Sequence, residues 1–88
     1  MEMISIGRDP SCDIVINDER ISRHHLELSL GGAGYMLTDH STNGTMVNGV
    51  RIQNQTISIN DGANVLLGGT VRLPWERVHK LLNSGGYW

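Results

Sequence analysis

Apolar residues alternate with polar residues along nearly the whole chain, in short runs that end at turn residues. Successive side chains of a β-strand face opposite sides, so a period of two predicts a strand with one buried face. Nine such runs are present, at residues 4–6, 14–16, 26–30, 35–39, 45–47, 50–52, 57–59, 65–67 and 71–73. Pairs such as Asn48-Gly49 and Asp61-Gly62 separate the runs and favour turns. The pattern predicts an all-β sandwich of short antiparallel strands.

The last part of the chain departs from this period. Four apolar residues follow Pro74 at roughly helical spacing, namely Trp75, Val78, Leu81 and Leu82. Gly85-Gly86 would end such a helix. We therefore expect the sandwich to cover residues 1–74 and a short C-terminal helix or tail to cover residues 75–88.

Size and composition limit the function classes. The chain has 88 residues and no Phe, which predicts one small domain with an aliphatic core of Ile, Leu, Val and Met. Its single cysteine, Cys12, excludes an internal disulfide and is expected to be a small buried side chain. The net charge is −2, whereas general nucleic-acid binders carry a basic excess.

The sequence also limits the cellular location of the protein. No apolar run is long enough to span a membrane, and the N-terminus lacks the pattern of a signal peptide. These features predict a cytoplasmic protein that neither inserts into membranes nor binds nucleic acid. The compact start after Met1 suits a bacterial setting.

Three of the predicted loops carry an unusual set of polar side chains. Gly7-Arg8 directly follows a strand, residues 19–25 read ERISRHH, and residues 41–45 read STNGT. A strand and its return separate the first loop from the second, and another pair separates the second from the third. Loops at the same end of a sandwich come together although they are distant in the sequence. The three loops are therefore expected to meet at one end.

That end would hold a cluster of hydrogen-bond donors: Arg8, Ser22, Arg23, Thr42 and Asn43. The cluster has two guanidinium groups, two hydroxyls and an amide, and no carboxylate is interleaved among them. A phosphate monoester carries a charge of about −1.5 to −2 and three acceptor oxygens. Arginine binds such a group through paired, charge-assisted hydrogen bonds. The cluster therefore predicts a phosphate-recognition site of the kind used in signalling.

The same residues, in this order and spacing, resemble the forkhead-associated (FHA) domain family. The matching stretches are Gly7-Arg8, Ser22-Arg23-His24-His25, Asp39-x-Ser41-Thr42-Asn43-Gly44-Thr45 and Val47-Asn48-Gly49, within about residues 3–73. The resemblance implies an eleven-stranded β-sandwich that binds phosphothreonine peptides or proteins in Ser/Thr-kinase signalling, without catalysis or a cofactor. Family members usually have two further strands before the Gly-Arg pair, so the sandwich here is expected to be N-terminally trimmed to about nine strands.

The resemblance implies roles for the residues that would meet the ligand. Arg8, Ser22 and Thr42 are similar to the family's phosphate contacts, and Arg23 is expected to add a second positive charge to the phosphate. Asn43 resembles the asparagine that bonds the peptide backbone beside the phosphothreonine.

The resemblance also implies roles around the site. His25 is similar to a histidine that braces the binding loops from beneath, and Gly7, Gly44 and Thr45 are expected to stabilise these loops. Arg20 resembles a position that reads the third residue after the phosphothreonine, where an acidic preference is expected.

Other functions are disfavoured by the same residues. The histidines and Cys12 lack the CxxC or HxxxH spacing of a zinc site, so no metal site is expected. Ser22, His25 and Asp39 can be written as a triad, but no nucleophile elbow accompanies them, so no enzymatic activity is expected. A phosphate-independent structural or oligomerisation module of the same fold stays open as the alternative. The missing strands would leave an exposed sheet edge, through which a homodimer could form.

Overall fold

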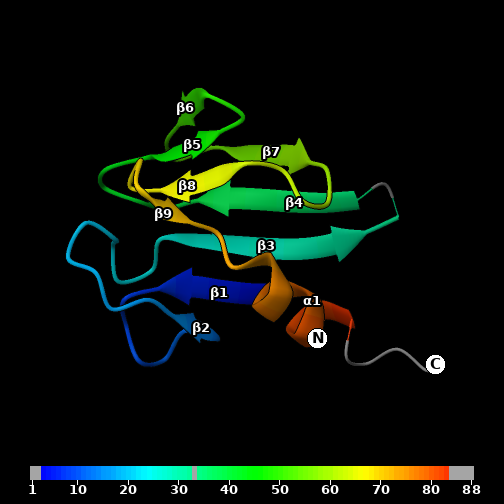
Figure 1. Cartoon of the computed structure of the whole chain (residues 1–88), viewed down its shortest axis with the longest axis horizontal. Helices are drawn as coiled ribbons and strands as arrows, with labels where there is room; N and C mark the ends of the chain where they lie inside the picture. Colours follow the sequence, from blue (N-terminus) through cyan, green and yellow to red (C-terminus); the bar gives the residue numbers. More distant parts are fainter. Residues whose placement is uncertain (1–2, 33, 84–88) are drawn as a thin grey trace.

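Nine β-strands and one helix make up the part of the chain that the computed structural model describes, residues 3–32 and 34–83. The first sheet has the strand order β2-β1-β3-β4-β7, and the second has the order β6-β5-β8-β9 (Figure 1). The strands are β1 Met3–Gly7, β2 Ile14–Val15, β3 Leu26–Gly31, β4 Gly34–Asp39, β5 Thr45–Val47, β6 Val50–Ile52, β7 Thr56–Ile59, β8 Val65–Leu67 and β9 Val71–Arg72. The expected all-β sandwich with a short C-terminal helix is confirmed.

One strand pair corrects the antiparallel pattern expected from the sequence. β2 runs parallel to β1, with Ile6 opposite Ile14 and Gly7 opposite Val15. The connection between the two strands returns beside β1, where the backbone N–H of Ser5 donates to Oδ2 of Asp13 over 2.9 Å. The chain therefore turns back along β1 within this loop, before β2 begins. As a result, β1 and β2 run in the same direction and finish at the same end of the sheet.

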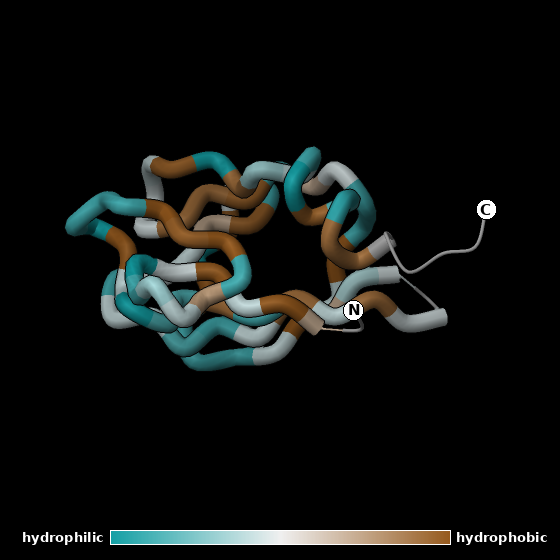
Figure 2. Tube along the Cα trace, turned by 90° about the horizontal axis from the view of Figure 1, so that it is seen from below, coloured by the Kyte–Doolittle hydropathy of each residue, from teal (hydrophilic) through white to brown (hydrophobic). Residues whose placement is uncertain are grey.

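The period of two decides which side chains form the core. Ile4 of β1 lies opposite Leu28 of β3, which in turn lies opposite Leu37 of β4, and all three are fully buried. Val65 and Leu67 of β8 are buried in the same core from the second sheet. Burial of each such side chain contributes roughly 1.5–3 kcal/mol to the stability of the fold. Figure 2 shows the two layers edge-on, with helix α1 at the right-hand end.

The three methionines among the described residues lie outside the core, contrary to the core of Ile, Leu, Val and Met expected from composition. Met3 and Met36 are 54% and 40% exposed, and Met46 is half-buried. The reason is strand parity, because Met36 lies between the buried Tyr35 and Leu37 and must face outward. The core is therefore built mainly from Ile, Leu and Val.

Helix α1 (Trp75–Asn83) shares the core of the strands. Its Val78 and Leu82 are buried in the same cluster as the strand residues. Trp75 packs edge to face on Tyr35 of β4, with ring centroids 5.1 Å apart, and its Nε1 donates to the carbonyl of Ala63 over 2.8 Å. The Gly85-Gly86 pair expected to end this helix lies outside the described residues. No helix within residues 3–32 and 34–83 has the length and apolar character needed to cross a membrane.

The strands deliver the three polar loops to one end of the sandwich. Arg8 follows β1, residues 16–25 connect β2 to β3, and residues 40–44 connect β4 to β5. Figure 1 shows these connections together at the left-hand end, away from helix α1, which lies right of centre below β3. The edge strands of the described sheets are β2, β7, β6 and β9, and a homodimer through one of these edges stays a prediction.

Candidate functional site

An open depression of about 440 Å³, here called the first depression, lies between the three loops. It is lined by Arg8, Glu19, Ile21, Ser22, Arg23, Thr42 and Asn43. All five donor residues that the sequence was expected to bring together therefore line one hollow. A second depression of about 550 Å³ shares Arg8 and Glu19 with the first and is completed by Asn17, Asp18 and Arg20.

Arg8 is fixed at the mouth of the first depression by the loop that faces it. Its backbone N–H donates to the carbonyl of Ser22 over 3.0 Å, and its side-chain Nε donates to the carbonyl of Ile21 over 3.0 Å. Neither terminal nitrogen of the guanidinium has a hydrogen-bond or ion-pair partner within the described part of the chain. Arg8 therefore presents a pair of oriented N–H donors and a full positive charge to the hollow.

Gly7 allows the first two loops to approach closely. A Cβ at this position would lie 2.1 Å from the carbonyl oxygen of Arg23, which is too close for any side chain. The same carbonyl accepts a hydrogen bond from the backbone N–H of Asp9 over 3.1 Å and from the thiol of Cys12 over 3.2 Å. Cys12 is buried, as expected, and together these contacts fix the backbone of Arg23, whose side chain is exposed.

Ser22 links the second loop to the third. Its Oγ accepts a hydrogen bond from the backbone N–H of Thr42 over 2.9 Å. Its own backbone N–H donates to Nδ1 of His25 over 3.1 Å. The hydroxyl hydrogen of Ser22 remains available to a ligand, as does the hydroxyl of Thr42.

His25 lies fully buried beneath the loops, and its contacts fix its tautomer. Because Nδ1 accepts from Ser22, the ring proton must lie on Nε2, which is 3.1 Å from the carbonyl of Gly44 and 3.0 Å from Oγ1 of Thr45. Burial lowers the pKa of His25 below its ordinary value, against the opposing effects of the Gly44 carbonyl and the Asp39 charge. The neutral ring thus joins the second loop to the third.

Asp39 anchors the third loop from the core side. It is the last residue of β4, at an inward position, and its carboxylate is buried. It accepts hydrogen bonds from the backbone N–H and the hydroxyl of Ser41, from the hydroxyl of Thr45 and from the backbone N–H of Asn54. Burial by itself raises the pKa of Asp39, but these bonds outweigh it and hold the pKa below its usual range.

Asn43 spans the gap between the third loop and the second. Its Nδ2 donates to the carbonyl of Arg20 over 3.2 Å, which orients the amide. Its Oδ1 and the second hydrogen of Nδ2 remain to pair with the N–H and C=O of an extended chain. Gly44 follows with φ of +85°, a conformation that glycine adopts without strain.

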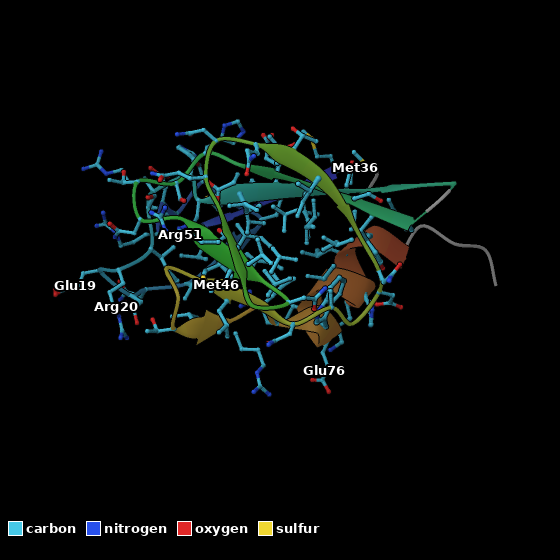
Figure 3. The ribbon with its side chains drawn as sticks, turned by 90° about the horizontal axis from the view of Figure 1, so that it is seen from above. Glu19, Arg20, Met36, Met46, Arg51 and Glu76 are labelled. Atoms are coloured by element: carbon cyan, nitrogen blue, oxygen red, sulfur yellow. The ribbon has the colours of Figure 1, made fainter. Side chains whose placement is uncertain are left out.

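Two carboxylates correct the expectation of a donor cluster without acids. Glu19 lines both depressions, and Asp18 lines the second. Oδ1 and Oδ2 of Asp18 accept from Nε and Nη2 of Arg20 over 3.0 and 2.8 Å, and this pair lowers the pKa of Asp18 to about 2. Figure 3 shows Glu19 and Arg20 projecting from the left-hand end. The charge of Arg20 is therefore already compensated in the free protein.

Sequence reasoning gave no site role to five residues that the structure connects to the loops: Glu19, Asp39, Ser41, Arg51 and Gln53. Asp39 carried a usable signal, since a carboxylate at an inward position of a strand must be paired. Glu19 also carried one, because it adjoins Arg20 in the same loop. Arg51 and Gln53 carried none, because β6 and the residues after it read as an ordinary strand and turn.

The buried state of His25 predicts how stability depends on pH. The pKa of His25 is lower in the folded protein than in the unfolded chain, so the unfolded chain binds a proton more readily. The contribution of neutral His25 to the free energy of unfolding is therefore complete above about pH 6.5 and is lost as the pH falls below that value. We expect urea denaturation to give a lower free energy of unfolding at pH 5.5 than at pH 7.5. His25→Asn, which keeps an acceptor near Ser22, should flatten that slope. Equal slopes for both proteins would contradict this account.

The arrangement suits a compact, multiply charged oxyanion on an extended chain. Two arginines, a serine and a threonine line one open hollow, together with an asparagine whose amide is oriented by Arg20. A tetrahedral anion can accept from several of these donors at once. The hollow is shallow and polar, which fits a surface group of another protein better than an apolar small molecule.

Comparisons with known proteins support a family assignment. Residues 4–68 match the family model described as FHA domain. The chain is 39% identical over 69 residues to the serine/threonine-protein kinase RAD53 of Saccharomyces cerevisiae, an alignment that covers 73% of this chain and 8% of the kinase. It is 33% identical over 90 residues to the FHA domain-containing protein PS1 of Arabidopsis thaliana, which covers 98% of this chain and 6% of that protein.

A solved structure gives the same result in three dimensions. The N-terminal FHA domain of S. cerevisiae Rad53p, solved in complex with a phosphothreonine peptide, is similar with a TM-score of 0.65 and 34% identity. The match covers 73% of this chain and 54% of that one. The chain spans less than a tenth of the length of the two curated relatives. With the family model matched over most of its strands, the chain belongs to the FHA domain family.

Proposed function

We propose that this domain is a non-catalytic module that binds phosphothreonine-containing proteins or peptides in Ser/Thr-kinase signalling. The observation that supports it most strongly is the pair of unpartnered terminal nitrogens of Arg8, held at the mouth of a hollow that also contains Arg23, Ser22 and Thr42. A charge-assisted hydrogen bond contributes roughly 1.5–3 kcal/mol. Three of them contribute roughly 5–9 kcal/mol before ordering costs, so a micromolar complex, on the order of −8 kcal/mol, also needs contacts to the peptide beside the phosphate.

Each residue has a distinct part in this proposal. Arg8 binds the phosphate through its two terminal nitrogens, and Arg23 adds a second positive charge. Ser22 and Thr42 donate hydroxyl hydrogen bonds to phosphate oxygens. Asn43 pairs with the peptide backbone beside the phosphothreonine, using the Oδ1 and N–H groups that its bond to Arg20 leaves available.

The similarity to the Rad53p domain supports the choice of ligand, because that domain was solved with a phosphothreonine peptide. Access to kinase substrates fits the cytoplasmic location expected from the sequence. The alternative, a structural or oligomerisation module that ignores phosphate, gives no reason for Arg8 and Arg23 to lie beside an open hollow with no ion-pair partner among the described residues. We therefore rank it second.

The test is binding of the domain to a mixed phosphothreonine-peptide library, with phosphoserine and unphosphorylated versions of the same library as controls. We expect retention of the phosphothreonine set alone, measured by fluorescence polarisation or by sequencing of the retained peptides. Equal retention of the unphosphorylated set, or retention of none, would favour the phosphate-independent module.

We further propose that Arg20 contributes to selection of a flanking residue together with Glu19 and Asp18. The second depression holds two arginines and two carboxylates. Once Arg8 binds the phosphate, Arg20, Asp18 and Glu19 leave this hollow with a net charge of −1. The acidic preference expected from Arg20 alone is therefore replaced by a preference for a basic or neutral polar residue.

The same library tests this selection. Wild type should enrich basic or neutral polar residues at one position after the phosphothreonine, and Glu19→Gln should shift the enrichment toward acidic residues by removing a negative charge. Glu76→Gln, at an exposed site on α1, is the matched control. Enrichment of Asp or Glu by the wild type would refute the proposed selection without affecting the role of Arg8.

A further inference from the structure

Two side chains after the Asn48-Gly49 turn hold the outer side of the third loop. Nη2 of Arg51, in β6, donates to the carbonyl of Asn43 over 3.1 Å and to Oε1 of Gln53 over 3.1 Å. Nε2 of Gln53 donates to the carbonyls of Ser41 and Thr42, over 3.2 and 2.6 Å. Three consecutive loop carbonyls are therefore bound by one linked pair of side chains.

Arg51 also packs against the loop backbone. A Cβ on Gly44 would lie 2.8 Å from Nε and 2.9 Å from Cζ of Arg51, so the guanidinium occupies the space beside this glycine. Neither Arg51 nor Gln53 lines the first depression. Figure 3 shows Arg51 lying against the body of the domain, inward of Glu19 and Arg20. The pair is connected to the first depression through the loop carbonyls that it binds.

The bonds have a consequence for charge as well as position. A carbonyl oxygen carries partial negative charge and would repel a phosphate if it turned into the hollow. Because Arg51 and Gln53 hold the carbonyls of residues 41–43, the opposite side of the loop is left to the hydroxyl of Thr42 and the amide of Asn43. The loop is also ordered before ligand arrives, which removes an entropic cost of binding.

We propose that Arg51 and Gln53 are positioning residues for ligand binding, which set the orientation of Thr42 and Asn43 by holding the loop carbonyls. This inference rests on the proposed function, since it assigns a second layer to the same site. The loop is thus clamped from two sides, by Asp39 and His25 within the core and by Arg51 and Gln53 outside it.

The experiment compares matched variants of the whole domain. Gln53→Met keeps the length of the side chain and removes both donated bonds, and Gln55→Met is its control at an exposed neighbour whose side chain makes no hydrogen bond in the described residues. Arg51→Met removes the charge and the bonds to Asn43 and Gln53, and Arg51→Lys keeps the charge alone. Arg72→Met is the control that removes an equal charge from an exposed position in strand β9. A phosphothreonine peptide retained by the wild type is the probe.

We expect Gln53→Met and Arg51→Met to weaken peptide binding about tenfold, as loss of bonds that orient the loop would do. Arg51→Lys should recover only part of the loss, and both controls should bind like the wild type. The backbone amide signals of Asn43 and Gly44 in NMR spectra of the free protein should shift and exchange faster in the two weakened variants. These measurements are made well below each thermal midpoint, so a purely structural role would leave the affinity of the folded protein unchanged.

Three outcomes would overturn the inference. Wild-type affinity in Gln53→Met, with the wild type binding its peptide, would show that the loop needs no such clamp and would leave the proposed function intact. Equal weakening in Arg51→Met and Arg72→Met, with full recovery in Arg51→Lys, would reduce the effect to general charge. Failure of the wild type to bind any phosphothreonine peptide would remove the proposed function and this inference together.

Discussion

Arg8→Ala is expected to lower the affinity for a phosphothreonine peptide about 100-fold and to lower the thermal midpoint by only about 4–8 °C. The substitution removes two N–H donors and a positive charge that have no other partner in the described part of the chain, and each charged bond contributes roughly 1.5–3 kcal/mol. The stability of the domain should fall by only about 1 kcal/mol, because the bond from Nε to the carbonyl of Ile21 is lost while the backbone bond from Arg8 to Ser22 remains. Isothermal titration calorimetry and thermal denaturation measure the two quantities separately.

Two controls make the Arg8 result specific. Arg8→Lys keeps the charge but not the paired donors, so its affinity should fall between those of the wild type and Arg8→Ala. Arg77→Ala, at an exposed position on α1, should bind normally. If Arg8→Ala bound the peptide as tightly as the wild type, the hollow between the three loops would not be the phosphate site.

Asp39→Ala is expected to have the largest effect on stability, a loss of about 3–5 kcal/mol. Removing this buried carboxylate leaves the hydroxyls of Ser41 and Thr45 and the amide of Asn54 without their acceptor. A domain of this length has a total stability of roughly 4–13 kcal/mol, so this loss would remove between about a quarter and all of it. Urea denaturation followed by tryptophan fluorescence would measure the change.

Asp61→Ala is the matched control for Asp39→Ala. Its carboxylate is 62% exposed and pairs with His79 at the surface, where ion pairs contribute little. Asp39→Asn should lie between the two, because it keeps the shape and presents an N–H group where a hydroxyl now donates. A loss in Asp39→Ala no larger than in Asp61→Ala would mean that the third loop is held by its outer contacts alone.

Most of the fold was predictable because the alternation of apolar residues is strict. Each predicted strand appears within a residue or two of its expected bounds, and the Asn48-Gly49 pair has the two positive φ values, +50° and +86°, that a tight hairpin turn requires. The errors concern matters that alternation does not encode. The residue pattern around Cys12 did not reveal that β2 is parallel to β1, and composition did not reveal that Met3 and Met36 face outward.

The meeting of the three loops at one end was predictable, whereas the hydrogen bonds among their residues were not. Loop residues such as Arg8, Ser22 and Asn43 are recognisable because three loops together supply several hydrogen-bond donors that can bind one phosphate. Glu19 lines the first depression because of the conformation of the loop at residues 16–25. The pairing of Arg20 with Asp18 depends on a turn within that loop. Arg51 and Gln53 lie seven or more residues beyond the loop that they hold, on the far side of a hairpin.

The sequence by itself determined the strands, the turns between them and the collection of donors at one end, because strand parity and turn chemistry are local properties. Only the tertiary structure decided which of those donors remain unpartnered. Arg20 finds Asp18 within its own turn, whereas Arg8 bonds the carbonyls of Ile21 and Ser22 on a distant loop, and its terminal nitrogens have no partner among the described residues. The physical reason is that hydrogen bonds are short and directional. Their partners are fixed only when β1, β3 and β4 have brought distant loops within about 3 Å of one another.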